Sequence, residues 1–214
     1  MNRLDTLISL VKPYYQSEDP AHDWAHVLRV ASNAEIICKN LKIGTEIPLA
    51  GAYCHDLINL PKDHPERKKA SFLSAEAAKK LLIESGFSID EIILIQSAII
   101  EHSYSAGAKA SSLESEIVQD ADRLDALGAI GILRCAAVNT KMKSSFYHFE
   151  DPLAQSREYN DKNYMLDHYF VKLFKLPELM NTLPAKKLAL ERVEFMKKFL
   201  DQMMNEVRNQ DVDH

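Results

Sequence analysis

Glycine, proline and cysteine are scarce in this sequence, which contains 6, 8 and 3 of them in 214 residues. So few glycines disfavour a glycine-rich nucleotide-binding loop, and the shortage of turn-forming residues disfavours a β-sandwich or β-barrel. Cys38, Cys54 and Cys135 lack the paired spacing of a zinc ribbon or a disulfide framework, so we expect reduced thiols. No apolar run approaches the roughly 18 residues of a bilayer span, so we do not expect this chain to be an integral membrane protein.

Positive charge is also in deficit, with 26 lysines and arginines against 31 acidic residues and a net charge of −5. Such a surface repels a polyanion, so nucleic acid is disfavoured as the main ligand. A phosphate-bearing partner must meet a local cluster of positive groups or a metal ion. The first residues carry an acid at Asp5 and no uninterrupted apolar core, so neither a secretory signal nor a transit peptide is visible. We therefore expect a cytoplasmic protein.

Apolar residues recur at helical spacing through most of the chain, for example at Val27, Val30, Ala31 and Ala34. Strand-like alternation is hard to find, so the sequence predicts an all-α fold. Without an internal repeat or a Ser/Gly linker, we expect residues 1–214 to form a single-domain helical bundle, with 141–214 as a C-terminal helical extension packed on the core. The predicted helices lie near residues 3–16, 22–41, 46–59, 66–85, 88–102, 112–123, 125–140, 156–176 and 184–208.

Two capping boxes support these helix boundaries. Ser88 is followed by Glu91, and Ser111 by Glu114, the spacing at which a hydroxyl and a carboxylate cap free backbone amides reciprocally. The stretch 141–152 is the most plausible long surface loop.

Histidines and aspartates gather in three segments: His22-Asp23-Trp24-Ala25-His26, then Cys54-His55-Asp56, and then Gln119-Asp120-Ala121-Asp122-Arg123-Leu124-Asp125. The second segment ends an apolar helix, so its polar groups are carried toward a buried position where they need partners. One divalent ion held by two neutral imidazoles and two carboxylates would satisfy several of these demands and leave two octahedral positions open. The alternative is that the histidines are core residues bonded to nearby carboxylates.

The order of these segments, with His26, then His55-Asp56, then Asp122, resembles the HD-domain phosphohydrolase superfamily, in particular its stand-alone bacterial hydrolases. The resemblance covers most of the chain and implies an all-helical fold of the HD-domain type. It implies that His26, His55, Asp56 and Asp122 are the metal ligands. The cofactor it implies is one divalent metal ion: Mn²⁺, Mg²⁺ or another first-row ion. A second ion is disfavoured, because the binuclear branch of the superfamily needs further histidines between His55-Asp56 and Asp122, and only His64 and His102 lie there.

Members of this superfamily hydrolyse phosphate esters and anhydrides. The resemblance thus implies a metal-dependent phosphohydrolase acting on a small nucleotide, and nucleoside triphosphate cleavage to monophosphate and pyrophosphate is the reaction to test first. One departure concerns the general base, which stays unassigned because Leu57-Ile58-Asn59 offers an amide where relatives often have a Glu-Asp pair.

Several further residues are candidates for catalysis or substrate binding. Asp56 and His102 are the catalytic candidates, and His102 would act as a proton donor or as a hydrogen-bond partner of the substrate. Lys62 and Arg67 follow the His-Asp doublet closely and are expected to contact phosphate, with Lys62 also a catalytic candidate. The remaining candidates are Arg29 and Arg123, which either touch substrate or orient a carboxylate, and Asp125, which could hold water or a ligand histidine.

Three other functions remain open at this point. An HD scaffold could be a metal-dependent nucleotide sensor or binding module without turnover, or a binuclear-iron HD oxygenase. The segment from His22 to His26 also resembles the two-histidine motif of zinc peptidases, although Asp23 is one methylene shorter than the usual glutamate and no third ligand has the expected spacing. The sequence leaves the oligomeric state unknown.

Overall fold

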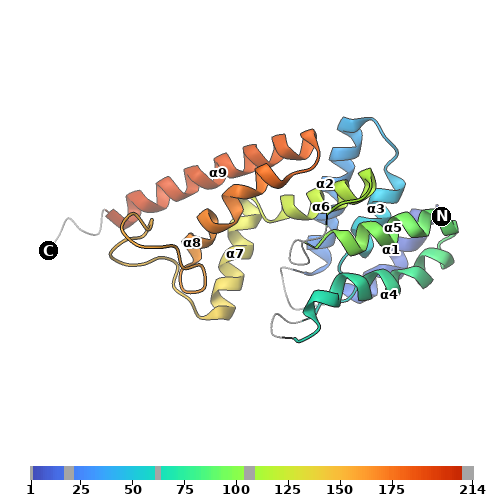
Figure 1. The fold of residues 1–214 in the computed structure, drawn as a ribbon, viewed down its shortest axis with the longest axis horizontal. Coiled ribbons are helices and arrows are strands. Elements are labelled where there is room, and N and C mark those ends of the chain that lie inside the picture. The colour runs from blue at the N-terminus through green and yellow to red at the C-terminus, as the bar shows by residue number, and fades with distance from the viewer. Residues whose placement is uncertain (1, 17–21, 61–63, 104–108, 209–214) are drawn as a thin grey trace. The chain divides into compact units, whose positions relative to one another are not determined.

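A computed structural model describes residues 2–16, 22–60, 64–103 and 109–208, and its regular structure is helical (Figure 1). Within these residues the sheet-like pairing is a single isolated bridge between Ser145 and Tyr164. The prediction of an all-α fold is confirmed. Among the described helices, none combines the length and the apolar character needed to cross a membrane.

The chain divides into two compact units. One unit comprises residues 1–125 with 181–185, and the other comprises 126–180 with 186–214. That residues 1–214 form a single domain, with 141–214 packed on its core, stays a prediction.

The first unit holds most of the buried core. Its helices are α1 (Arg3–Val11), η1 (Lys12–Tyr15), α2 (Trp24–Leu41), α3 (Glu46–Cys54), η2 (Arg67–Lys69), α4 (Ala70–Glu84), α5 (Ile89–Glu101) and α6 (Leu113–Asp125). Helix α2 packs against α6 and α3, and α4 packs along α5 (Figure 1). Apolar side chains such as Leu7, Val27, Leu82 and Ile99 are fully buried between these helices. Burial of one apolar face of each helix is what the 3.6-residue periodicity predicts.

Several helix ends differ from the prediction for identifiable reasons. The first helix ends at Val11 instead of residue 16, because Pro13 lacks an amide donor and the chain tightens into a 3₁₀ turn. The capping box of Ser88 and Glu91 is confirmed. The box predicted at Ser111 is wrong, because Ser112 accepts the amide of Ser115 at 3.1 Å. Both the amide and the hydroxyl of Ser111 donate instead to the Glu101 carboxylate.

Arg3 links α1 to two other helices. Its guanidinium donates to Glu46 on α3 at 2.6 Å and to Glu91 on α5 at 2.7 Å, and it lies 4.6 Å from the centre of the Phe87 ring. The hydrogen bond from Arg3 and the Ser88 amide lower the pKa of Glu91 to about 2. Because this pKa lies below its unfolded value, the stabilisation is complete above about pH 4.5 and is lost as the pH falls toward 2.

We therefore expect Arg3→Met to lower the free energy of unfolding at pH 7 by about 1 kcal/mol, since the paired groups are only partly shielded from solvent. The difference from the wild type should shrink below pH 4.5 and vanish near pH 2. Urea unfolding at several pH values measures it. Lys39→Met, which removes an exposed pair with Glu35 on one helix, is the control and should cost less than about 0.5 kcal/mol. A pH-independent loss in Arg3→Met would contradict the expectation.

The second unit contains α7 (Gly128–Met142), α8 (Met165–Val171), η4 (Leu173–Leu179) and most of α9 (Leu183–Arg208). The helix predicted from residue 156 begins only at Met165. Carboxylates hold the preceding segment in turns: Asp151 accepts the amide of Gln155 at 2.8 Å, and Asp167 accepts the amide of Asn160 at 2.6 Å. Asp167 is buried and also accepts two bonds from Arg157.

The start of α9 belongs to the first unit, where Asp120 on α6 holds it. Its buried carboxylate accepts four hydrogen bonds, from the amides of Asn181 and Thr182, the side-chain amide of Asn181 and the Thr182 hydroxyl. These donors precede the first turn of α9, where backbone amides have no intrahelical partners. Asp120 therefore connects α6 to the N-terminus of α9.

Candidate metal centre

His26 is positioned by the first turn of α2. Asp23 is the N-cap of this helix, and its carboxylate accepts the amide of His26 at 2.8 Å. The helix predicted from residue 22 begins at Trp24, so His22 precedes it, and its ring lies 6.0 Å from that of His26. Because Asp23 caps the helix, it is not free to act as the base that a zinc peptidase would need.

His55 and Asp56 are positioned by the end of α3. His55 is the C-cap residue and is fully buried, as the apolar character of the helix predicts. The chain that follows is held from α4, where the buried Ser74 hydroxyl accepts the amide of Ile58 at 3.0 Å. No role is predicted for Ser74 from the sequence. A small polar residue at a buried position of an apolar helix is the signal that could have identified it.

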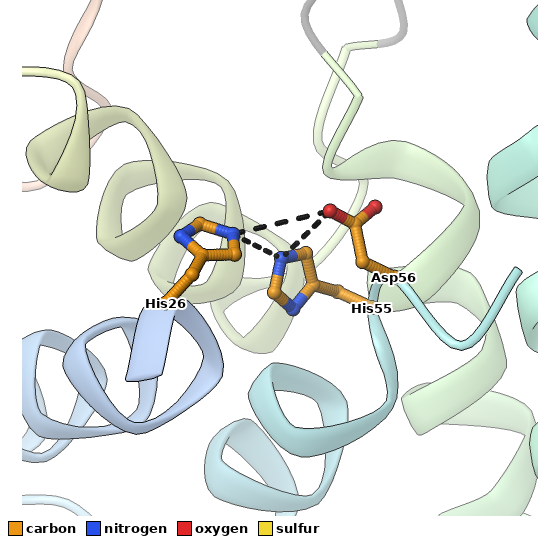
Figure 2. A group of neighbouring side chains, drawn as sticks. All are labelled: His26, His55 and Asp56. Carbon is orange, nitrogen blue, oxygen red and sulfur yellow. Dashed lines mark hydrogen bonds and ion pairs between the residues drawn. The ribbon is translucent and has the colours of Figure 1, made fainter. Parts of the chain in front are cut away.

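Helix α6 brings Asp122 to the same place, so the structure gathers the four predicted ligands. The Nε2 atoms of His26 and His55 lie 3.2 Å apart, and Asp56 Oδ2 lies 3.9 Å and 3.5 Å from them (Figure 2). Asp122 Oδ1 lies 3.6 Å and 4.0 Å from the same two nitrogens. In Figure 2 the two imidazoles and the Asp56 carboxylate point toward one another, and their ligand atoms lie within 4.8 Å.

Hydrogen bonds on the far side of each ring define its tautomer. His55 Nδ1 donates to the carbonyl of Ala52 at 2.7 Å, and His26 Nδ1 donates to the carboxylate of Asp125 at 2.7 Å. In the neutral rings both Nε2 atoms then present lone pairs, which cannot hydrogen-bond to each other. A shared cation resolves this conflict, and it is the usual arrangement of metal-binding histidines.

The distances fit a six-coordinate ion. Ligand atoms about 2.1 Å from such a cation are about 3.0 Å apart at adjacent corners and about 4.2 Å apart at opposite corners. The separations between the imidazole nitrogens and their neighbours span 3.2 to 4.0 Å. The mixed nitrogen and oxygen donors suit a first-row ion or Mg²⁺.

The two imidazoles and the two carboxylates differ in exposure. The side chains of His26 and His55 are 1% and 0% exposed, whereas those of Asp56 and Asp122 are 20% and 26% exposed. The imidazoles thus close the buried side of the site, and the carboxylates border solvent. A site open on one side is the form that catalytic rather than structural metal centres take.

The ionisation states suit cation binding. Burial, only partly offset by Asp56, lowers the pKa of His55 to about 4. Burial raises the pKa of Asp56 and Asp122, but the neighbouring imidazoles outweigh it, so both values fall below their usual range. At neutral pH the carboxylates are therefore ionised and His55 is neutral, which is the state that binds a metal ion.

His102 ends α5 beside these residues. Its Nδ1 donates to the carbonyl of Ile99 at 2.7 Å, and its Nε2 lies 3.6 Å from Asp56 Oδ1. Burial lowers the pKa of His102, but the carboxylates of Asp56 and Asp122 outweigh it, so the pKa is raised. The structure thus places this predicted catalytic residue next to the ligand cluster.

The predicted substrate contacts have different surroundings. Arg29 donates to both oxygens of Asp125, at 2.7 Å and 3.1 Å, so its guanidinium orients a carboxylate, one of the two roles left open by the sequence. Arg123 acts on Asp120: burial raises the pKa of this carboxyl, and the hydrogen bonds from Asn181 and Thr182 together with the charge of Arg123 offset only part of that rise. Arg67 donates to the carbonyl of Leu60 at 2.5 Å and so holds the chain that follows the His-Asp doublet. Lys62 lies outside the described residues.

Together, the helical fold and the His-His-Asp cluster define a domain of the HD type, a class that binds divalent metal ions, and the HD domain family matches residues 23–127. The chain belongs to the HD superfamily of hydrolases. It is 30% identical to the uncharacterized protein YpgQ of Bacillus subtilis over 211 residues, which are 97% of this chain and 95% of YpgQ.

Solved structures agree with this assignment. The crystal structure of Bacillus subtilis YpgQ in complex with ADP is similar with a TM-score of 0.75 and 28% identity, covering 95% of this chain and 94% of that one. An HD-superfamily hydrolase from Bacillus thuringiensis is similar with a TM-score of 0.74 and 28% identity, covering 95% and 96%. The resemblance to stand-alone bacterial HD hydrolases is confirmed.

Removal of metal is expected to destabilise the protein, because a cation that binds only the folded state raises the free energy of unfolding. At a free Mn²⁺ concentration of about 100 times Kd, the gain is about 2.7 kcal/mol. Trp24, which stacks on Tyr53 with ring centres 6.0 Å apart, reports unfolding by its fluorescence. The melting temperature should rise with Mn²⁺ and return to the metal-free value with excess chelator. An unchanged melting temperature across the titration would contradict the metal centre.

Proposed function

We propose that this protein is a divalent-metal-dependent phosphohydrolase acting on a small nucleotide, and that it cleaves nucleoside triphosphates to monophosphate and pyrophosphate. The observation that carries the proposal is the convergence of His26, His55, Asp56 and Asp122, with both imidazole Nε2 atoms turned toward the carboxylates. We propose that these four side chains hold one ion. The partial exposure of the carboxylates leaves a side from which a phosphate can approach.

Each group has a defined part in this proposal. A divalent cation held by these four side chains would supply a lowered pKa of bound water and polarisation of a phosphoryl oxygen. The buried imidazoles exclude water from the inner side and fix the position of the site. His102 presents Nε2 beside Asp56, where it can donate to a substrate oxygen or to the leaving group. Lys62 and Arg67 remain the proposed phosphate contacts, since they lie within the chain that directly follows the ligands.

The nucleotide is proposed on two grounds. The related YpgQ of Bacillus subtilis was crystallised in complex with ADP. In addition, the net charge of −5 favours a small anion bound at a local cation over an extended polyanion. Both grounds are independent of the ligand geometry, and both support a soluble phosphorylated molecule as the substrate.

The test is incubation of metal-free protein, reconstituted separately with Mn²⁺ and Mg²⁺, with a panel of nucleoside mono-, di- and triphosphates. Phosphorus NMR distinguishes pyrophosphate from orthophosphate and so identifies the bond that breaks. We expect pyrophosphate and monophosphate from at least one triphosphate, and no product in the presence of chelator.

The same assay separates the alternatives. Orthophosphate in place of pyrophosphate keeps the phosphohydrolase but overturns the proposed bond. Binding of nucleotides without cleavage under every metal condition overturns hydrolysis and favours the sensor. Iron content together with oxygen consumption would favour the binuclear oxygenase.

A further inference from the structure

The three imidazoles at the metal centre differ in what their Nδ1 atoms contact. Those of His55 and His102 donate to the backbone carbonyls of Ala52 and Ile99, three residues earlier in their own helices. That of His26 donates to a carboxylate from another helix, Asp125 Oδ2, at 2.7 Å. His26 therefore has a charged partner on the far side of its ring, whereas the other two rings have neutral ones.

Asp125 is in turn held by Arg29. The guanidinium donates from Nε to Oδ1 at 2.7 Å and from Nη2 to Oδ2 at 3.1 Å, so the carboxylate is gripped at both oxygens. The Asp125 side chain is 2% exposed, and that of Arg29 is 30% exposed. A carboxylate this deeply buried needs a positive partner, and the two-point geometry fixes its plane as well as its charge.

The spacing along the two helices explains the arrangement. Arg29 follows His26 by three residues on α2, and Asp125 follows Asp122 by three residues on α6. Residues three apart lie on one face of a helix, and α2 and α6 pack against each other. The packed faces thus present one layer of ligands, His26 and Asp122, and one supporting layer a turn further on.

We propose that Asp125 and Arg29 are positioning residues of the metal centre: Asp125 holds His26 as the tautomer whose Nε2 lone pair faces the ligand cluster, and Arg29 holds Asp125 in place. The anionic partner also makes His26 Nε2 a stronger donor to a cation. This inference rests on the metal centre of the proposed function but does not depend on which substrate is cleaved, or on whether any is.

The direct test observes the tautomer in the metal-free protein. Long-range proton–nitrogen NMR of protein labelled with ¹⁵N-histidine should show the His26 ring protonated on Nδ1 at a pH where it is neutral. In Asp125→Asn the anionic acceptor is lost, and we expect a mixture of the two tautomers. The affinity for Mn²⁺ alone, measured by calorimetry, should fall about 10- to 100-fold. Arg29→Lys keeps the positive charge but loses the two-point contact with Asp125. This variant should weaken the Mn²⁺ affinity several-fold.

The second unit offers matched controls. Asp167 is also a buried aspartate gripped at both oxygens by an arginine, Arg157, at 2.6 Å and 2.8 Å, and its other described partner is a backbone amide rather than an imidazole. Asp167→Asn and Arg157→Lys should lower the melting temperature but leave the Mn²⁺ affinity within about twofold of the wild type. A loss of affinity in these controls equal to that in the Asp125 and Arg29 variants would overturn the inference, because it would reflect general destabilisation.

Three further outcomes are decisive. Wild-type Mn²⁺ affinity together with an unchanged His26 tautomer in a folded Asp125→Asn protein overturns the inference. If circular dichroism shows that this variant is unfolded, Arg29→Lys decides in the same way. A wild type that binds Mn²⁺ with the expected tautomer, and loses affinity in the variants, but cleaves no nucleotide supports the inference while the proposed hydrolysis fails.

Discussion

Replacement of Asp56 by asparagine is expected to abolish nucleotide cleavage, with a loss of at least about 10³-fold. The carboxylate lies within 4 Å of the Nε2 atoms of both buried imidazoles, and asparagine keeps its shape while removing its charge. A loss of about 4 kcal/mol of transition-state stabilisation corresponds to this factor, and removal of one of the two anionic ligands also weakens the hold on the cation.

Two measurements check this result. Elemental analysis after dialysis should show wild-type protein with close to one ion per chain and Asp56→Asn with little. The nucleotide assay should show the loss of turnover under saturating Mn²⁺. Asp161→Asn is the matched control, since Asp161 also pairs with an imidazole, that of His168 at 3.0 Å, but at a half-buried position of the second unit. Full metal occupancy in Asp56→Asn would show that the ligand assignment is wrong.

Replacement of Asp120 by alanine is expected to destabilise the protein by about 3 to 4 kcal/mol. The four donors at the start of α9 would lose their common acceptor inside the fold, where water cannot replace it fully. Hydrogen bonds to a charged group contribute about 1.5 to 3 kcal/mol each, but the partly exposed side chain of Asn181 would recover some of this loss. Few single substitutions cost more.

Urea unfolding followed by circular dichroism measures this effect. Asp120→Asn should be almost as harmful, because in either orientation its side-chain NH2 would face a backbone amide donor, that of Asn181 or that of Thr182. Asn2→Ala is the comparison for an exposed cap, where the loss should be about 1 kcal/mol because the Asn2 side chain accepts the amide of Asp5 at 2.8 Å. A cost below about 1 kcal/mol for Asp120→Ala would show that the N-terminus of α9 does not depend on this carboxylate.

The sequence could predict what depends on neighbours along the chain. The apolar spacing predicts the helices of the first unit, and the capping box at Ser88 is local because both of its bonds span three residues. The order of His26, His55-Asp56 and Asp122 predicted which side chains meet, because that order is the signature of a known family.

Predictions from the sequence are wrong where a partner distant in the chain decides the local structure. Ser111 has the spacing of a cap, yet the carboxylate of Glu101 binds it and leaves Ser112 to begin α6. The helix predicted from residue 156 is replaced by turns, because Asp167 accepts the amide of Asn160 and two bonds from Arg157. Helical propensity differs between residues by only a few tenths of a kcal/mol, which a buried charged pair readily exceeds.

Periodicity and motif order are properties of the chain, so they were enough to predict the all-α fold, the family and the four candidate ligands. The partners of the remaining charges emerge only from the packing of the helices: Arg29 binds Asp125, Asp120 binds the start of α9, and the Nδ1 bond to Asp125 orients His26. The reason is physical, since a buried charge takes whichever opposite group the packing brings within about 3 Å, and that group is often about 100 residues away in the sequence.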